Sequence, residues 1–238
     1  MYCGKWRSWL ARVLLPLILF FFLGCGTAVK KVGFSNGKGR VIRLPLPGKS
    51  QDMELNRAIE SRHSIREFTG EDVPFEMISL LLWSAVGRGN GGSKTDAVTG
   101  ATGVAPSAGA IYPFRVYVVM KSSVYRYNAN ENSLELIRTG VRPEDVSKEA
   151  LGQEALLSPL IIVLACDFRK TEAKYGVRAE RYVYMEAGHI AQNIILESTS
   201  LGIGSVTIGA FNDDGIKRIL GFEAEKPLYL IPVGKPAS

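Results

Sequence analysis

The stretch Glu60-Ser-Arg-His-Ser-Ile-Arg-Glu-Phe68 marks the place where a helical pattern gives way to extended backbone. Before it, Leu55, Ala58 and Ile59 recur at the spacing of one helical face, which predicts a helix over residues 52–61. From residue 65 onward the apolar spacing becomes that of an extended segment. The junction therefore determines where its polar side chains point.

In extended backbone every second side chain lies on the same side, so Arg62, Ser64 and Arg66 are expected to share one face. Two guanidinium groups and a hydroxyl group can donate hydrogen bonds to a phosphate dianion and to a polar chain attached to it. The alternative interpretation is a solvated basic turn at the end of a helix.

The rest of the chain mixes extended and helical patterns. Alternating or continuous apolar runs predict strands at residues 114–120, 124–127, 133–138, 159–168, 203–209 and 227–233. Apolar residues at helical spacing predict helices at residues 74–86, 143–157, 177–201 and 213–220. Because these elements do not follow a strict βαβ order, the sequence favours an α+β fold.

Four segments occur along the chain in a characteristic order. They are Arg62-His-Ser-Ile-Arg66, Ala105-Pro-Ser-Ala-Gly-Ala-Ile-Tyr-Pro113, Glu186-Ala-Gly-His-Ile-Ala-Gln-Asn193, and Gly202-Ile-Gly-Ser-Val-Thr-Ile-Gly-Ala-Phe211 followed by Pro232-Val-Gly-Lys-Pro236. This ordered set resembles the flavin-dependent nitroreductase family and covers residues 52–238. The Pro-Ser-Ala-Gly-Ala-Ile-Tyr-Pro form is similar to the SagB-type branch, which includes dehydrogenases that oxidise azolines to thiazoles and oxazoles in modified peptides.

The resemblance implies a nitroreductase-like central mixed sheet flanked by helices, in an intertwined homodimer with FMN at each of two subunit interfaces. It implies that Arg62, Ser64 and Lys235 bind the FMN phosphate, with His63 in the same cofactor-binding segment. Arg66 would lie nearer the ribityl chain or the pyrimidine edge. Lys235 also follows a glycine at the end of the last predicted strand, where backbone can approach an anion closely. A solvated lysine is the alternative there.

By the same resemblance, the flavin ring is reached from the partner subunit by the small residues Pro106, Ser107, Ala108 and Gly109. Ile208 and Gly209 match a strand end whose backbone amide approaches flavin N5. Gly103 and Val104 depart from the branch, which often has a polar pair at those positions, and Ala210 replaces a second glycine.

Lys174 and Tyr175 match a Lys-Tyr pair that azoline-oxidising relatives use as catalytic base. A partly desolvated lysine has a lowered pKa and can accept a proton, so the pairing is chemically sensible. The alternative is a surface lysine beside a packing tyrosine. Four polar side chains of the 177–201 helix are instead expected to satisfy hydrogen bonds in the core: Glu186, His189, Gln192 and Asn193.

Composition excludes several classes of function. The 238 residues are 46% hydrophobic, which is enough for one sizeable core. The formal charge of +6 falls to +3 without residues 1–24, because three of the 29 basic residues and none of the 23 acidic residues lie there. No basic and aromatic stripe suggests nucleic acid. The two histidines have no Cys or acidic cluster near them, which argues against a metal site.

Residues 1–24 are predicted to be a targeting segment. A short basic stretch precedes eleven apolar residues, 13–23, which suit a secretory signal. Gly24-Cys25 after this run resembles a bacterial lipoprotein signal, with Cys25 lipidated and the domain anchored to a membrane outside the cytoplasm. Residues 25–51 are predicted to be a basic linker, and 52–238 the FMN-binding domain. An uncleaved anchor or a misassigned start, with a cytoplasmic protein, is the alternative.

The leading functional hypothesis is an FMN-dependent oxidoreductase acting on a small nitro, quinone-like or unsaturated organic substrate. Azoline dehydrogenation in peptide modification is the second hypothesis, and a flavin-binding lipoprotein without turnover is the third. Outside the cytoplasm NADH and NADPH are not normally supplied, so export would make them poor electron donors.

Overall fold

The computed structural model describes residues 40–48, 53–88 and 103–237. Contacts divide the chain into residues 1–31 and 32–238, and all described residues belong to the second unit. The predicted targeting segment and Cys25 lie outside the described residues, and so do residues 89–102.

The described part is organised around a seven-stranded sheet with the order β1-β4-β3-β2-β5-β7-β6. The strands are β1 (Val41–Arg43), β2 (Phe114–Met120), β3 (Ser123–Asn128), β4 (Ser133–Thr139), β5 (Leu160–Cys166), β6 (Gly204–Ser205) and β7 (Lys226–Gly234). β5 lies between β2 and β7, and all seven of its residues are buried. This confirms the prediction of an apolar strand covered on both faces. Each large aliphatic side chain buried there stabilises the fold by about 1.5–3 kcal/mol.

The predicted mixed sheet is wrong for the described strands, because every neighbouring pair runs antiparallel. The reason lies in the connections. β2, β3 and β4 follow one another through tight turns, which reverse the chain at each step. β5 reaches β7 only after helices and β6, and it meets β7 in the opposite direction.

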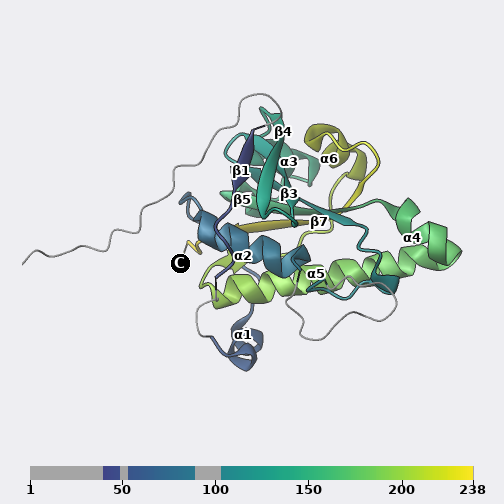
Figure 1. Ribbon diagram of the computed structural model, residues 1–238. Coiled ribbons are helices and arrows are strands. Elements are labelled where there is room, and N and C mark those ends of the chain that lie inside the picture. The colour runs from purple at the N-terminus through teal and green to yellow at the C-terminus, as the bar shows by residue number, and fades with distance from the viewer. Residues whose placement is uncertain (1–39, 49–52, 89–102, 238) are drawn as a thin grey trace, which may run out of the picture. The chain divides into compact units, whose positions relative to one another are not determined.

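Helices cover both faces of the sheet, as Figure 1 shows, and this confirms the α+β class. They are α1 (Leu55–Ser61), α2 (Phe75–Val86), α3 (Pro143–Glu149), α4 (Phe168–Tyr175), α5 (Ala179–Ser200) and α6 (Asp213–Leu220). α2 and α5 enclose one core with the sheet, whereas α3 and α6 enclose a second core on the opposite face. None of the helices in the described ranges is long and apolar enough to cross a bilayer.

Three predicted segments differ from the structure by more than a few residues or in kind. The predicted 143–157 helix ends at Glu149, because Leu151 and Gly152 both adopt positive φ values, 61° and 72°. The predicted 203–209 strand is reduced to β6 and an isolated bridge at Ile208. The predicted 25–51 linker contains β1, which pairs with β4, so the folded domain begins before residue 52.

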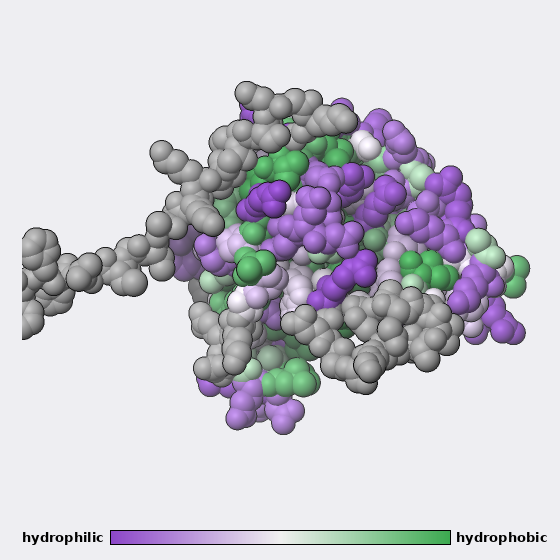
Figure 2. All heavy atoms as spheres, in the orientation of Figure 1, coloured by the Kyte–Doolittle hydropathy of each residue, from purple (hydrophilic) through white to green (hydrophobic). Residues whose placement is uncertain are grey.

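The apolar stripe of α1 is only partly buried in its own chain. Ala58 is buried, but Leu55 is 64% exposed and Ile59 is 54% exposed. Figure 2 shows apolar surface over α1, at the lower edge of the view. The helix therefore presents apolar side chains that the described residues do not cover.

Candidate functional site

The segment after α1 is fastened to the sheet by its backbone. The Ile65 N–H donates to the carbonyl of Ser205 at 3.1 Å. The Ile65 side chain packs so closely on Gly204 that a Cβ at that glycine would lie 2.6 Å from it. Because Ile65 faces inward, its neighbours Ser64 and Arg66 are exposed. Arg62 is half-buried, so the face expected to be shared by Arg62, Ser64 and Arg66 stays a prediction, and no regular strand forms here.

The C-terminal end of β7 brings Lys235 beside this segment. The Thr69 N–H donates to the carbonyl of Lys235 at 2.9 Å, and Phe68 and Pro236 form a bridge. We call Arg62, Ser64, Arg66 and Lys235 the basic cradle. Residues predicted from distant parts of the sequence are thus neighbours in the structure.

The cradle side chains differ in the partners that they already have. Arg62, Ser64 and Arg66 make no side-chain hydrogen bond or ion pair with another described residue, so their donors are available to an anion. Lys235 Nζ instead forms an ion pair with Glu71 Oε1 at 2.8 Å. This donor set fits a phosphate group. His63 is less suited, because its Nδ1 donates to the carbonyl of Ser61 at 2.9 Å.

The segment predicted to reach the flavin ring is held by a buried carboxyl group. The Ser107 hydroxyl donates to Glu186 Oε2 at 2.6 Å and accepts the N–H of Tyr112 at 2.9 Å. We call residues 106–112 the ring-side loop. Since the hydroxyl of Ser107 is engaged inside the protein, the loop presents mainly backbone and small side chains to the outside.

The backbone of the ring-side loop is strained. Gly109, Ala110 and Tyr112 have φ values of 59°, 52° and 49°. Such left-handed conformations cost roughly 1–2 kcal/mol for residues with a side chain. The hydrogen bonds at Ser107, together with one from the Gly103 N–H to the Tyr112 hydroxyl at 2.8 Å, hold the loop in this shape.

Lys174 and Tyr175, at the end of α4, meet the ring-side loop at Gly109. A Cβ placed on Gly109 would lie 2.5 Å from both Lys174 Nζ and the Tyr175 hydroxyl oxygen. The structure therefore brings the predicted catalytic pair and a predicted ring-contacting residue together. The desolvation expected of Lys174 is not present in the single chain, because its side chain is exposed.

Burial determines the protonation state of the Glu186 carboxyl group. The residue is 4% exposed, and burial raises the pKa of its carboxyl group to about 7, while the hydrogen bond from Ser107 acts in the opposite direction. The expected role in core hydrogen bonding is confirmed for Glu186 and for Asn193, whose Nδ2 donates to the carbonyl of Ser84 at 3.1 Å. It is wrong for His189 and Gln192, which lie on the exposed face of α5.

Ile208 and Gly209 have different backbone partners. The Ile208 N–H donates to the carbonyl of Leu230 at 2.8 Å, and the Leu230 N–H returns the bond at 3.0 Å. The N–H of Ile208 is therefore engaged within the sheet, and the prediction of a backbone amide that approaches flavin N5 rests on Gly209. Gly209 is exposed, and the nearest atom to a Cβ there would be Tyr229 Cε1 at 3.9 Å. That glycine leaves room for a flat ring.

The predicted site residues form two groups within the described residues. One group is the basic cradle, which is tied to β6 and β7; the other is the ring-side loop with Lys174, Tyr175 and Glu186. No hydrogen bond or ion pair between described residues joins the two groups.

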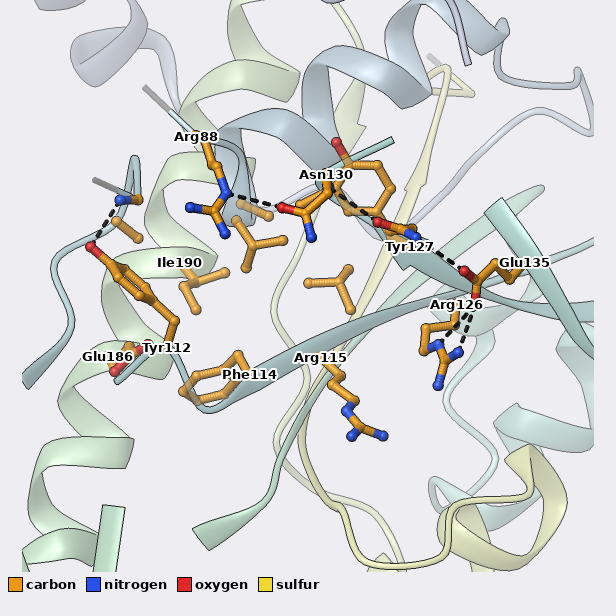
Figure 3. A pocket seen from close by; sticks show the side chains of 17 residues that line it. Arg88, Tyr112, Phe114, Arg115, Arg126, Tyr127, Asn130, Glu135, Glu186 and Ile190 are labelled. Atoms are coloured by element: carbon orange, nitrogen blue, oxygen red, sulfur yellow. Dashed lines mark hydrogen bonds and ion pairs between the residues drawn. The ribbon is translucent and has the colours of Figure 1, made fainter. Parts of the chain in front are cut away.

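A separate cavity of about 440 Å³ lies between α2, α5 and the sheet (Figure 3). None of the predicted cofactor residues lines it. Its charged residues include Arg115 of β2 and Arg126 of β3. This cavity was not predicted from the sequence, where arginines inside otherwise apolar strand patterns were the available signal.

The chain belongs to the nitroreductase family. The model of the "Nitroreductase family" matches residues 59–235. "Putative nitroreductase MJ1384" of Methanocaldococcus jannaschii is 34% identical over 205 residues, which are 83% of this chain and 98% of that protein. "Putative NADH dehydrogenase/NAD(P)H nitroreductase" of Methanothermobacter thermautotrophicus is 27% identical over 82% of this chain and 84% of that protein. The family is typically flavin-dependent.

Two further similarities refine this assignment. A crystal structure from Ralstonia eutropha JMP134, described as "a putative nitroreductase", superimposes with a TM-score of 0.71 and 28% identity, over 86% of this chain and 93% of that chain. "Trifolitoxin operon protein TfxC" of Rhizobium leguminosarum bv. trifolii is 30% identical over 113 residues, which are 47% of this chain and 32% of that protein.

Proposed function

We propose that the chain is an FMN-dependent oxidoreductase that transfers hydride between the flavin and a small organic, quinone or nitro substrate. The observation that carries this proposal is the basic cradle. Segments from two distant parts of the sequence are joined there by backbone hydrogen bonds, and three of the four cradle side chains have no described partner. A phosphate supplies the missing acceptors.

The protein's own groups then have separate tasks. FMN supplies the hydride chemistry when bound. Arg62, Ser64 and Lys235 hold its phosphate, and the exposed residue Gly209 leaves room for the ring edge. Lys174 Nζ and the Tyr175 hydroxyl are placed beside Gly109 to hold or move a proton.

The absorbance spectrum of the purified protein tests the cofactor. We expect a flavin spectrum, or a flavin spectrum after addition of FMN, with one FMN per chain. Turnover with nitro and quinone acceptors then separates an enzyme from a flavin-binding protein without activity. Colourless protein that takes up no FMN would contradict the proposal.

We also propose a homodimer in which the ring-side loop of one subunit completes the cradle of the other. The uncovered Leu55 and Ile59 support an interface at α1, and the separation of the two groups of site residues supports a shared site. Sedimentation should show a dimer. Leu55→Glu should shift it toward monomer and weaken FMN binding, whereas the exposed Leu151→Glu, on a different element, should not.

The electron donor depends on the N-terminal segment. If Cys25 is lipidated and the domain lies outside the cytoplasm, reduction by a quinol or by the substrate itself is expected in place of NAD(P)H. Anaerobic reduction with NADH, NADPH and a quinol tests this. Rapid reduction by NAD(P)H would contradict it, and so would a Cys25→Ser variant that fractionates like the wild type in the cytosol.

Azoline dehydrogenation is the second candidate, and two observations favour it. The chain resembles the trifolitoxin operon protein over about half its length. Lys174 and Tyr175 also lie against Gly109 of the ring-side loop. On this hypothesis Lys174→Ala abolishes oxidation of an azoline-containing peptide while FMN content is unchanged. An unchanged rate would assign the pair to structure.

A further inference from the structure

The cavity arises where two neighbouring strands separate. β2 and β3 are paired only from Tyr117–Arg126 to Met120–Ser123. Beyond that point Phe114 and Val116 remain paired with β5, whereas Tyr127 remains paired with β4. We call the space between them the fork cavity. Its volume of about 440 Å³ lies within the range of small-molecule sites, roughly 300–1,000 Å³.

The two walls of the fork cavity differ in chemistry. One wall is apolar and includes Val86, Phe114, Val116 and Ile190. The other is polar and includes side chains of the β3–β4 hairpin (Figure 3). A ligand that fits both walls has an apolar body and a polar end.

The charged side chains of the fork cavity determine whether the polar end of the ligand should be positive or negative. Arg115 forms an ion pair with Glu225, and Arg126 forms one with Glu135 at 2.6 Å. Arg88 differs from both, because within the described ranges its side chain forms a hydrogen bond to a neutral group and no ion pair: Nε donates to Asn130 Oδ1 at 3.1 Å.

Glu186, the second acidic residue of the lining, does not neutralise the positive charge of Arg88. Glu186 faces the cavity from α5. Burial raises its pKa to about 7, so it carries little negative charge below that pH. A guanidinium group that has no carboxylate partner among the described residues, at one end of an apolar wall, favours an anion.

We propose that the fork cavity binds a small organic anion with an apolar body, and that Arg88 binds its carboxylate. The ligand packs against Phe114 and Ile190, and its carboxylate adds charge-assisted hydrogen bonds at Arg88. The fork cavity shares no residue with the basic cradle, whereas Tyr112 and Glu186 belong both to its lining and to the ring-side group. Binding of the anion at Arg88 requires no flavin chemistry, and the titration below is therefore made with and without FMN.

Calorimetric titration of the full-length protein with 3-phenylpropanoate tests the proposal, with and without saturating FMN. We expect saturable binding in both cases. Arg88→Gln should weaken it at least about 10-fold, as expected for loss of a hydrogen bond to a charged group. The neutral 3-phenylpropan-1-ol should bind weakly to the wild type. Arg57→Gln, an exposed arginine on α1, is the matched control and should bind like the wild type.

Three results would overturn the proposal. One is the absence of saturable binding to the wild type. Another is equal affinity of Arg88→Gln and wild type. The third is loss of binding when FMN is added, which would place the probe in the flavin site.

Discussion

The side chains of the basic cradle lie at the surface, whereas the ring-side loop is held by a hydrogen bond from Ser107 to the buried carboxyl group of Glu186. In the cradle, backbone hydrogen bonds at Ile65 and Thr69 position the segment, and the two arginine side chains remain for a ligand, whereas Lys235 is paired with Glu71. In the loop, a side-chain hydrogen bond holds strained backbone in place. Anion binding at the cradle should therefore depend on charge and salt concentration. The stability of the ring-side loop should depend on pH and packing.

The largest effect is expected from Glu186→Gln, on the pH dependence of stability. The folded-state pKa of Glu186 is raised to about 7 from 4.5 by burial, so its stabilising contribution is complete below 4.5 and is lost as pH rises through 7. At 1.36 kcal/mol per pKa unit, the loss is about 3 kcal/mol. Glutamine cannot ionise, so the variant should lack this fall.

Urea unfolding between pH 4.5 and 8.5 measures the difference. Glu180→Gln is the control, because Glu180 is exposed on the same helix. Parallel profiles for Glu186→Gln and wild type would show that the loop is not fastened by a titrating carboxyl group.

Arg62→Ala should have the next largest effect, this time on the cradle. Loss of hydrogen bonds from a charged donor costs about 1.5–3 kcal/mol, or 10- to 150-fold in FMN affinity. Flavin fluorescence titration at low and high salt measures it. Arg57→Ala should retain wild-type affinity. An unchanged dissociation constant for Arg62→Ala would mean that the phosphate is bound elsewhere.

Gly109→Ala tests the backbone of the loop. Its φ of 59° and the proximity of Lys174 and Tyr175 both oppose a side chain. We expect a loss of about 1–2 kcal/mol in unfolding free energy and a fall in turnover, because Lys174 and Tyr175 must move. Gly70→Ala is the control, since nothing lies within 4 Å of a Cβ there. Equal stability of both variants would contradict the strain described for this loop.

The smallest effect is expected from Glu71→Gln. The carboxylate of Glu71 forms an ion pair with Lys235 Nζ, and both side chains are about 60% exposed. Removing this competitor should strengthen FMN binding, by no more than about fivefold, because exposed ion pairs contribute roughly 0.2–1 kcal/mol. Asp72→Asn breaks a comparable surface pair with Lys121 and should leave FMN affinity unchanged. Weaker FMN binding by Glu71→Gln would show that Glu71 positions Lys235.

The sequence predicted those features whose signal is local. The limits of β2 and α6 were predicted correctly, because their apolar spacing and end residues are continuous in the chain. β1 was missed because three residues in a basic stretch carry little periodicity. The bond between Ser107 and Glu186 joins positions 79 residues apart, so its geometry could not be read from spacing. The engaged amide of Ile208 depends on register with β7, which sequence alone does not give.

The position of β7 has a consequence for folding during synthesis of the protein. It is the last described strand in the sequence, yet it lies inside the sheet, between β5 and β6. One edge of β5, an entirely apolar strand, therefore stays without a partner on the ribosome until residues 226–234 have been synthesised. Unpaired apolar strand edges are sites of aggregation. A nascent chain of this protein should consequently need protection by chaperones until β7 has been inserted.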